Sequence, residues 1–178
     1  MDKISIQPGE LYLTRQPALL QTILGSCVGL TFWCARLGVG ALCHGVLPRS
    51  PAGAIVPEGF RYVDFSIRYL ADAFDGLGAS REELEIKLFG GADVLTSIAA
   101  DGRRPTVGSL NCQTAWEVLG HEGFRTRASD LGGKRGRTIC FNTATGEVLV
   151  FRHAILPAAG RSNAALHSLH HEPRQGIG

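Results

Sequence analysis

The sequence predicts an α+β fold, and three observations indicate it. Three segments, at 11–14, 22–33 and 39–47, are rich in β-branched and aromatic residues and read as strands. Glycine-rich breaks separate them. Apolar residues at helical spacing follow, first within 61–78 and again from about 111 to 119. The segments "RTICFN" and "EVLVFRHAI" then flank "TATG" as a hairpin, with Gly146 supplying the positive φ of the turn. Strands grouped around two helices are typical of this class.

The first elements form a predicted hairpin followed by a loop. Segment 22–33 reads as one strand and 39–47 as the strand that returns beside it. The segment "PRSPAGAIVPEGF" after them contains the prolines and glycines of a loop. Because this loop begins shortly after His44, we expect it to rim a cleft.

The middle of the chain predicts helix, strand and helix. In 61–78 the apolar residues recur every three or four positions, so this helix should cover a sheet face. The segment "LEIKLFGGA" alternates over a period of two, which predicts a half-buried strand that ends at Gly90 and Gly91. Ser109 or Asn111 is the expected N-cap of the second helix. The segments "FGGAD" and "DLGGKRGR" read as turns. Arg135 and Arg137 are expected to face water, with binding of a carboxylate as the alternative.

Composition sets the domain count and excludes several classes of protein. The chain has 178 residues, 44% of them apolar, which predicts a single domain over 1–157 and a mobile tail over 158–178. Its net charge of +2 comes from 18 basic and 16 acidic residues spread along the chain, which argues against a nucleic-acid partner. The absence of a leader or membrane-spanning stretch predicts a cytoplasmic protein without membrane insertion. Five cysteines without CxxC pairing argue against a disulfide framework or structural zinc.

The predicted hairpin brings a cysteine and a histidine together. A turn centred between Ala35 and Arg36 pairs residues whose numbers sum to 71, which sets Cys27 directly opposite His44. Opposed residues share a face, with Cβ atoms about 4.5–5.5 Å apart. The two other cysteines of this region, Cys34 and Cys43, fall on the opposite face and are predicted to be spectators.

This pairing predicts nucleophilic chemistry. A neighbouring imidazolium lowers the pKa of a thiol and so supplies thiolate for attack on an acyl carbon, with a bell-shaped pH profile. Small residues at Gly25 and Ser26 let backbone N–H groups approach a developing oxyanion. The Thr22 hydroxyl is expected to hold the His44 imidazole in one tautomer.

Two alternatives compete with catalysis. Cysteine is among the most often buried residues, so spacing alone favours a packed core for Cys27 and His44, in a protein that only binds partners. The same two side chains with one further ligand would instead make a metal-binding module. Thiol reactivity and metal content separate these alternatives from an enzyme.

The order of several motifs resembles the CheD family of chemoreceptor glutamine deamidases. The matching segments are "TILGSC", "CHGVLP", "YVDFSI", "KLFGGAD", "VGSLN" and "DLGGKRGR", across about 10–152. The resemblance implies a layered α/β sandwich with mostly antiparallel sheets flanked by helices, similar to other cysteine hydrolases. It places the catalytic cysteine, histidine and threonine on Cys27, His44 and Thr22. Asn111, from "VGSLN", joins Gly25 and Ser26 among the oxyanion and substrate-binding groups.

The same resemblance implies a reaction and its partners. Cys27 would attack a glutamine side-chain amide in a chemoreceptor, His44 would protonate the departing ammonia, and water would hydrolyse the thioester to leave glutamate. Hydrolysis of receptor methyl esters is a possible second activity, and no cofactor or metal is expected. The implied partners are receptor cytoplasmic helices and a CheC-type phosphatase, which a non-catalytic adaptor would also bind.

Overall fold

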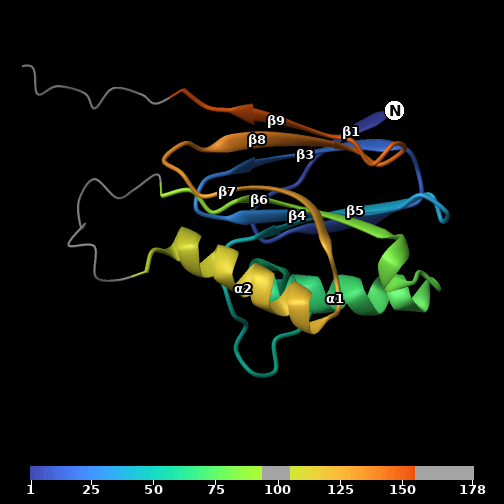
Figure 1. The fold of residues 1–178 in the computed structure, drawn as a ribbon, viewed down its shortest axis with the longest axis horizontal. Helices are drawn as coiled ribbons and strands as arrows, with labels where there is room; N and C mark the ends of the chain where they lie inside the picture. The colour runs from blue at the N-terminus through green and yellow to red at the C-terminus, as the bar shows by residue number, and fades with distance from the viewer. Residues whose placement is uncertain (94–104, 155–178) are drawn as a thin grey trace, which may run out of the picture.

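The computed structural model describes residues 1–93 and 105–154, which form two stacked β-sheets with two α-helices against one of them (Figure 1). One sheet has the strand order β1-β3-β8-β9 and the other β2-β5-β4-β6-β7. The elements are β1 (Asp2–Ser5), β2 (Leu11–Thr14), β3 (Ala18–Leu24), β4 (Val28–Cys34), β5 (Val39–Gly45), α1 (Val63–Gly76), β6 (Leu84–Gly90), α2 (Val107–His121), β7 (Thr126–Leu131), β8 (Arg137–Asn142) and β9 (Val148–Arg152). Short 3₁₀ turns occupy Glu58–Arg61 and Arg81–Glu83.

The α+β prediction is confirmed, including mostly antiparallel pairing. Two of the strand pairs, β1 with β3 and β6 with β7, are parallel, and the other five are antiparallel. Both helices cover the outer face of the five-stranded sheet (Figure 1). No helix within 1–93 and 105–154 has the length and apolar character needed to cross a membrane. The predicted tail over 158–178 lies outside the described residues.

Two apolar layers hold the three structural layers together. Between the helices and the five-stranded sheet lie side chains such as Phe32, Ile67 and Phe74. Between the two sheets lie others such as Leu24 and Phe141. Both faces of the five-stranded sheet are therefore buried, and its central strands β4 and β5 show almost no exposed positions.

Two boundary predictions are wrong, and two strands were not predicted. Segment 22–33 is not one strand, because the chain leaves the first sheet at Leu24 and enters the second at Val28. Helix α2 begins at Val107, earlier than expected, and its N-cap is Thr106, whose side chain accepts a hydrogen bond from the Ser109 backbone. Strands β1 and β7 were not predicted, since both are short, largely polar or exposed segments without the alternation of a half-buried strand.

The expected exposure of Arg137 is also wrong. Its side chain is buried and donates to the carboxylate and carbonyl of Asp130 and to the carbonyls of Gly132 and Arg135. Arginine suits this place because its planar group carries five donors that can satisfy several acceptors at once. Only residues 132–136 of "DLGGKRGR" form the predicted connection, since the segment begins in β7 and ends in β8, and this connection wraps around one guanidinium.

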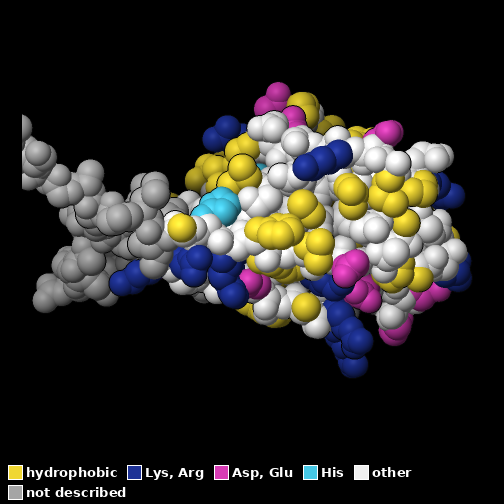
Figure 2. Space-filling model, turned by 90° about the horizontal axis from the view of Figure 1, so that it is seen from above, with side chains coloured by type: hydrophobic (Ala, Val, Ile, Leu, Met, Phe, Trp, Pro, Cys, Tyr) yellow, Lys and Arg dark blue, Asp and Glu magenta, His cyan; other side chains and the backbone are white. Residues whose placement is uncertain are grey.

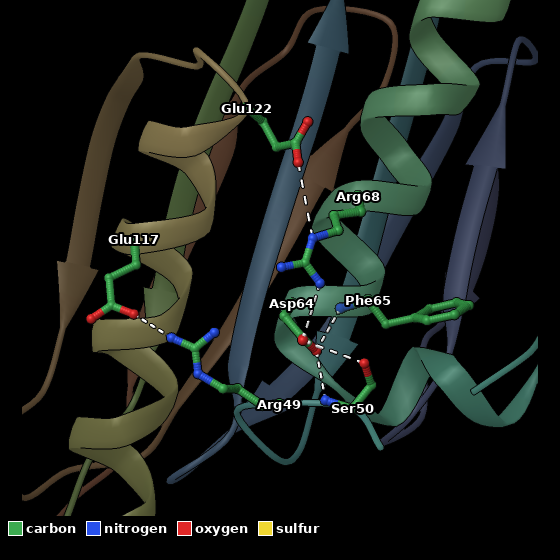
Figure 3. A network of polar contacts seen from close by, with 7 residues as sticks. All are labelled: Arg49, Ser50, Asp64, Phe65, Arg68, Glu117 and Glu122. Atoms are coloured by element: carbon green, nitrogen blue, oxygen red, sulfur yellow. Dashed lines mark hydrogen bonds and ion pairs between the residues drawn. The ribbon is translucent and has the colours of Figure 1, made fainter. Parts of the chain in front are cut away.

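The loop after His44 is tied to both helices by a polar network (Figure 3). Asp64, at the start of α1, accepts from the Ser50 backbone at 2.8 Å and from the Arg68 guanidinium at 3.2 Å. Arg49 forms an ion pair with Glu117 of α2. The loop is thereby fixed to the helix layer at two points.

We expect Asp64→Ala to lower the free energy of unfolding by about 1–3 kcal/mol, because the part-buried Ser50 N–H loses its acceptor and Arg68 keeps only Glu122 as an ion-pair partner. Urea unfolding measures the change. Asp72→Ala is the matched control on the exposed face of the same helix, and it should stay within about 0.5 kcal/mol of the parent. Equal stabilities for the two variants would contradict an anchoring role for Asp64.

No helix of the described residues covers the outer face of the four-stranded sheet. Figure 2 looks onto this side of the molecule and shows hydrophobic side chains gathered among white and charged ones. The exposed apolar side chains of β3 and β9 belong to this face, namely Ile23, Leu149 and Phe151. The sheet that presents them also carries Thr22 on its inner face.

Candidate active site

The two sheets place Thr22 and His44 against each other in the interior. Thr22 points inward from β3 and His44 points inward from β5, and both side chains are buried. Cys27 lies in the segment 25–27 that carries the chain from β3 to β4, and it is partly buried. The fold therefore brings a hydroxyl and an imidazole together directly beside the connection that holds the thiol.

The Thr22 hydroxyl fixes the tautomer of His44. Thr22 Oγ1 lies 2.7 Å from His44 Nδ1 and 2.7 Å from the carbonyl oxygen of Ile6. The carbonyl can only accept, so the single hydroxyl proton is donated to it, and Oγ1 must accept from Nδ1–H. The proton of the neutral imidazole is then on Nδ1, and Nε2 carries the free lone pair. Nε2 is buried and has no hydrogen-bond partner among the described residues.

Burial keeps both His44 and Cys27 uncharged. Desolvation lowers the pKa of His44 to about 4, despite opposing effects of the Ile6 carbonyl and Glu10. Burial also raises the pKa of the Cys27 thiol. The predicted imidazolium that lowers this thiol pKa is contradicted, because burial lowers the pKa of His44 and raises that of Cys27. At neutral pH the resting groups are a thiol and a neutral imidazole, since neither charged form is solvated well enough.

The predicted register is wrong by two residues. Gly29, not Cys27, pairs with His44, because the β4–β5 turn is centred one residue later than expected. A shift of two keeps every side chain on its predicted face, so Cys34 and Cys43 do lie in the helix-facing core, away from the inner face that carries His44. No hydrogen bond joins the Cys27 thiol to His44 within 1–93 and 105–154.

Two glycines bring a second strand end against the Cys27 segment. The backbone N–H of Gly91 donates to the Cys27 carbonyl at 2.8 Å, and that of Ala92 donates to the Gly25 carbonyl at 2.8 Å. Gly90 has φ +106°, and a Cβ there would lie 2.2 Å from the Cys27 carbonyl oxygen. Only glycine allows this approach. The N–H groups of Ser26 and Cys27 donate no backbone hydrogen bond to the described part of the chain.

Asn111 connects the nucleophile segment with the strand that carries His44. Its side chain is fully buried on α2, and Nδ2 donates to the carbonyls of Ser26 and Val46, each at 3.0 Å. Both amide protons are therefore used inside the protein and are not offered to a substrate oxyanion. The arrangement fits a residue that sets the distance between the Cys27 segment and the exit of β5.

Sequence reasoning missed four backbone positions that shape this site. The carbonyls of Ile6 and Val46 accept hydrogen bonds from Thr22 and Asn111, respectively. Gly90 and Gly91 allow the backbone to approach the Cys27 segment closely. The adjacent glycines in "FGGAD" were the available signal, because paired glycines mark close backbone approach as well as turns. Backbone carbonyls leave no such signal.

A pocket of about 370 Å³ opens beside Thr22 and His44. Its wall includes the end of β1, the chain that follows it, and the second half of β3. Cys27 does not line this pocket. Within residues 1–93 and 105–154 no group of three or more His, Cys, Asp or Glu side chains is placed to hold a metal ion.

Comparison with known proteins identifies the family. The sequence model of the family described as CheD chemotactic sensory transduction matches residues 46–152, more than half of the chain. The chain belongs to the CheD family. This match begins at Val46, just after His44, so it does not itself include Thr22, Cys27 or His44.

Individual CheD relatives match more of the chain. "Probable chemoreceptor glutamine deamidase CheD 2" of Geobacter sulfurreducens is 41% identical over 149 residues, which cover 84% of this chain and 89% of that protein. "Probable chemoreceptor glutamine deamidase CheD" of Oleidesulfovibrio alaskensis is 39% identical over 150 residues, covering 83% and 71%. "Probable chemoreceptor glutamine deamidase CheD" of Thermococcus kodakarensis is 35% identical over 147 residues, which cover 82% of this chain and 90% of that protein. The CheD likeness therefore reaches well to the N-terminal side of residue 46.

Proposed function

We propose that this chain is a chemoreceptor glutamine deamidase that uses Cys27 as nucleophile and His44 as base. The observation that carries the proposal is the hydrogen-bond order at His44. Thr22 accepts from Nδ1–H, which leaves the Nε2 lone pair free on β5, the strand that pairs with β4 directly after Cys27. The names of the CheD relatives supply the substrate class. The fold is in our view that of a cysteine hydrolase, comprising one domain over 1–157.

In the proposed reaction the neutral pair is the working form. His44 Nε2 removes the thiol proton as Cys27 Sγ attacks the carbonyl carbon of the glutamine side chain, and Nε2–H then protonates the departing ammonia. Water, activated by the same nitrogen, hydrolyses the thioester, releases glutamate and restores the thiol. In this proposal the thiol and the imidazole come into contact when substrate binds. Catalytic hydrogen bonds are often long in unliganded sites and tighten only in the complex with substrate. A receptor methyl ester would react by the same steps with methanol leaving.

The remaining site residues have separate roles in this proposal. The backbone N–H groups of Ser26 and Cys27 stabilise the oxyanion, with Gly25 allowing the segment its shape, because they have no internal backbone acceptor among the described residues. Asn111 is a positioning residue rather than an oxyanion donor, since its amide protons are already used. The partners are cytoplasmic helices of chemoreceptors, which places the reaction in the cytoplasm, and a CheC-type phosphatase is a second proposed partner.

Mass spectrometry of a chemoreceptor cytoplasmic fragment tests the proposed activity. Incubation with the protein should raise the mass of a specific glutamine by about 1 Da, the difference between an amide and a carboxylic acid, with ammonia released. A protein that binds the fragment tightly and leaves every glutamine unchanged would instead be the adaptor considered above.

Thr22→Val should lower kcat for deamidation by about 10²-fold, because valine keeps the shape but cannot accept from His44 Nδ1–H. Thr22→Ser keeps the hydroxyl and should retain most of the turnover. If Thr22 served only as a strand former, valine would be harmless and serine would cost some stability. A Thr22→Val protein with parental kcat would remove Thr22 from the site.

Gly90→Ala should lower the deamidation rate and destabilise the fold by about 1–3 kcal/mol, because the added Cβ would meet the Cys27 carbonyl oxygen and the backbone is left-handed there. Gly78→Ala is the matched control, since Gly78 also has positive φ, +76°, but has nothing within 4 Å of an added Cβ. The control should lose stability alone. Equal deamidation rates for both variants would show that the Gly90 contact does not shape the site.

A further inference from the structure

Strand β3 is paired with β8 up to its last residue, but on its other edge the neighbouring strand β1 ends halfway along it. Strand β1 runs beside it only from Ala18 to Gln21, and the last backbone bond of that edge joins the Ile6 N–H to the Gln21 carbonyl at 2.8 Å. The chain then crosses to the other sheet, where the Gly9 N–H donates to the His44 carbonyl at 2.9 Å. On this edge, no described strand accompanies residues 22–24.

The open edge presents one backbone donor and one backbone acceptor. In a strand the N–H and C=O of a residue point to the same side, and successive residues alternate between the two sides. The Gln21 carbonyl points to β1, so the N–H and C=O of Ile23 point the same way, past the end of β1. No described backbone group meets them there. The Ile23 side chain is 63% exposed beside this edge.

The pocket beside the base lies at this edge. Gln21, Thr22, Ile23 and His44 line it together with the chain from Ser5 to Pro8. The side-chain oxygen Oε1 of Gln21 is buried and has no hydrogen-bond partner in the described structure. A buried acceptor without a partner is costly unless a ligand supplies a donor. The pocket therefore brings the open β3 edge at Ile23 together with the candidate base.

We propose that the β3 edge at Ile23 binds an extended segment of the substrate polypeptide by strand addition. This inference rests on the proposed function and names how its substrate is held. The Ile23 N–H and C=O pair with the substrate backbone. The target glutamine is thereby held beside Leu24, where β3 ends and the segment of Cys27 begins. A helix already uses its own backbone groups, so a helical substrate must unwind locally to bind here.

Backbone-modified peptides test the proposal on the unaltered protein. The probe is a synthetic peptide of about nine residues from a chemoreceptor modification region, with the glutamine central. N-methylation at the backbone positions that face the edge should raise KM at least about tenfold, the cost of one lost hydrogen bond, and methylation at the alternate positions should not. The same peptide locked as a helix by a side-chain staple should be a poor substrate. Equal kcat/KM for all these peptides would overturn strand addition.

A protein variant tests the same edge from the other side. Proline at position 23 removes the N–H that faces the edge without removing a ladder bond to β8. We expect Ile23→Pro to raise KM at least about tenfold, with the iodoacetamide reactivity of Cys27 unchanged. Ile23→Ala keeps the N–H, so it should raise KM less than Ile23→Pro does. Parental KM in a folded Ile23→Pro protein would refute the proposal, and the peptide series decides if that variant fails to fold.

The outcomes separate docking from catalysis. If the unaltered protein deamidates neither the receptor fragment nor any peptide, the proposed function fails, whatever binds at the edge. If it deamidates methylated, stapled and plain peptides equally, the function stands and the docking site does not. A second copy of this chain on the edge would appear as a concentration-dependent dimer lost in Ile23→Pro, which would also overturn the proposal.

Discussion

Cys27→Ala should abolish deamidation, with a loss of at least about 10³-fold, because no other group in the described site can form the thioester. The fold should be unaffected, since the Cys27 side chain is only partly buried and its carbonyl contact with Gly91 belongs to the backbone. The measurement is the rate of mass gain in a receptor cytoplasmic fragment, compared with circular dichroism of the same preparation.

Cys43→Ala is the matched control for this experiment. Cys43 comes from strand β5, next to His44, but lies in the helix-facing core, where burial raises its pKa to about 12. Its loss should lower stability by leaving a small cavity, and turnover of the folded fraction should stay at the parental level. If turnover survives in Cys27→Ala, or vanishes in folded Cys43→Ala, then Cys27 is not the nucleophile.

The two cysteines also show why part of the site was predictable despite a wrong register. Side chains in a strand alternate with a period of two, so a pairing error of two residues leaves each side chain on the correct face. Cys43 and His44 are consecutive, and their separation onto opposite faces needs no knowledge of the partner strand. Which residue pairs with His44 depends on the position of the turn between the two strands. That turn lies one residue later than predicted, so Gly29 and not Cys27 is the neighbour.

The break between β3 and β4 could not be found from hydrophobic pattern. Strand β4 is buried on both faces, because helices cover one side of its sheet and a second sheet covers the other. A doubly buried strand shows a continuous apolar run instead of alternation, so it merged with β3 into one predicted strand. The glycine and serine before Cys27 were the local sign of the change of sheet.

The side-chain chemistry of the site was partly beyond sequence as well. Thr22 was placed beside His44 by family resemblance and distance along the chain, and the structure confirms their hydrogen bond. The acceptor that fixes its direction is the Ile6 carbonyl, which has no signature in the sequence. The protonation states were predicted in the wrong direction, because burial of His44 and Cys27 depends on packing between two sheets whose stacking was unknown.

His44→Asn should abolish deamidation as fully as loss of Cys27, at least about 10³-fold, because the thiol then has no base and the ammonia no acid. Asparagine is close in size and can still donate to the Thr22 hydroxyl, so the variant should fold. In the parent protein kcat/KM should rise through pH 4 as the buried imidazole loses its proton, and fall only above the ordinary thiol pKa. An acidic limb near 6.5 would show that His44 is solvated in the working enzyme.

Stability measurements test the same burial without relying on activity. The pKa of His44 is about 4 in the folded protein and about 6.5 in the unfolded chain, so between these values the unfolded state binds more protons. The free energy of unfolding therefore keeps its full His44 contribution above pH 6.5. It falls as pH drops toward 4, by up to about 1.4 kcal/mol per pH unit. Urea unfolding should show this slope in the parent and a smaller one in His44→Asn, because His121 and His153 are common to both proteins. Parallel stability curves for the two proteins would mean that His44 is not buried in its neutral form, and the proposed base would lose its structural support.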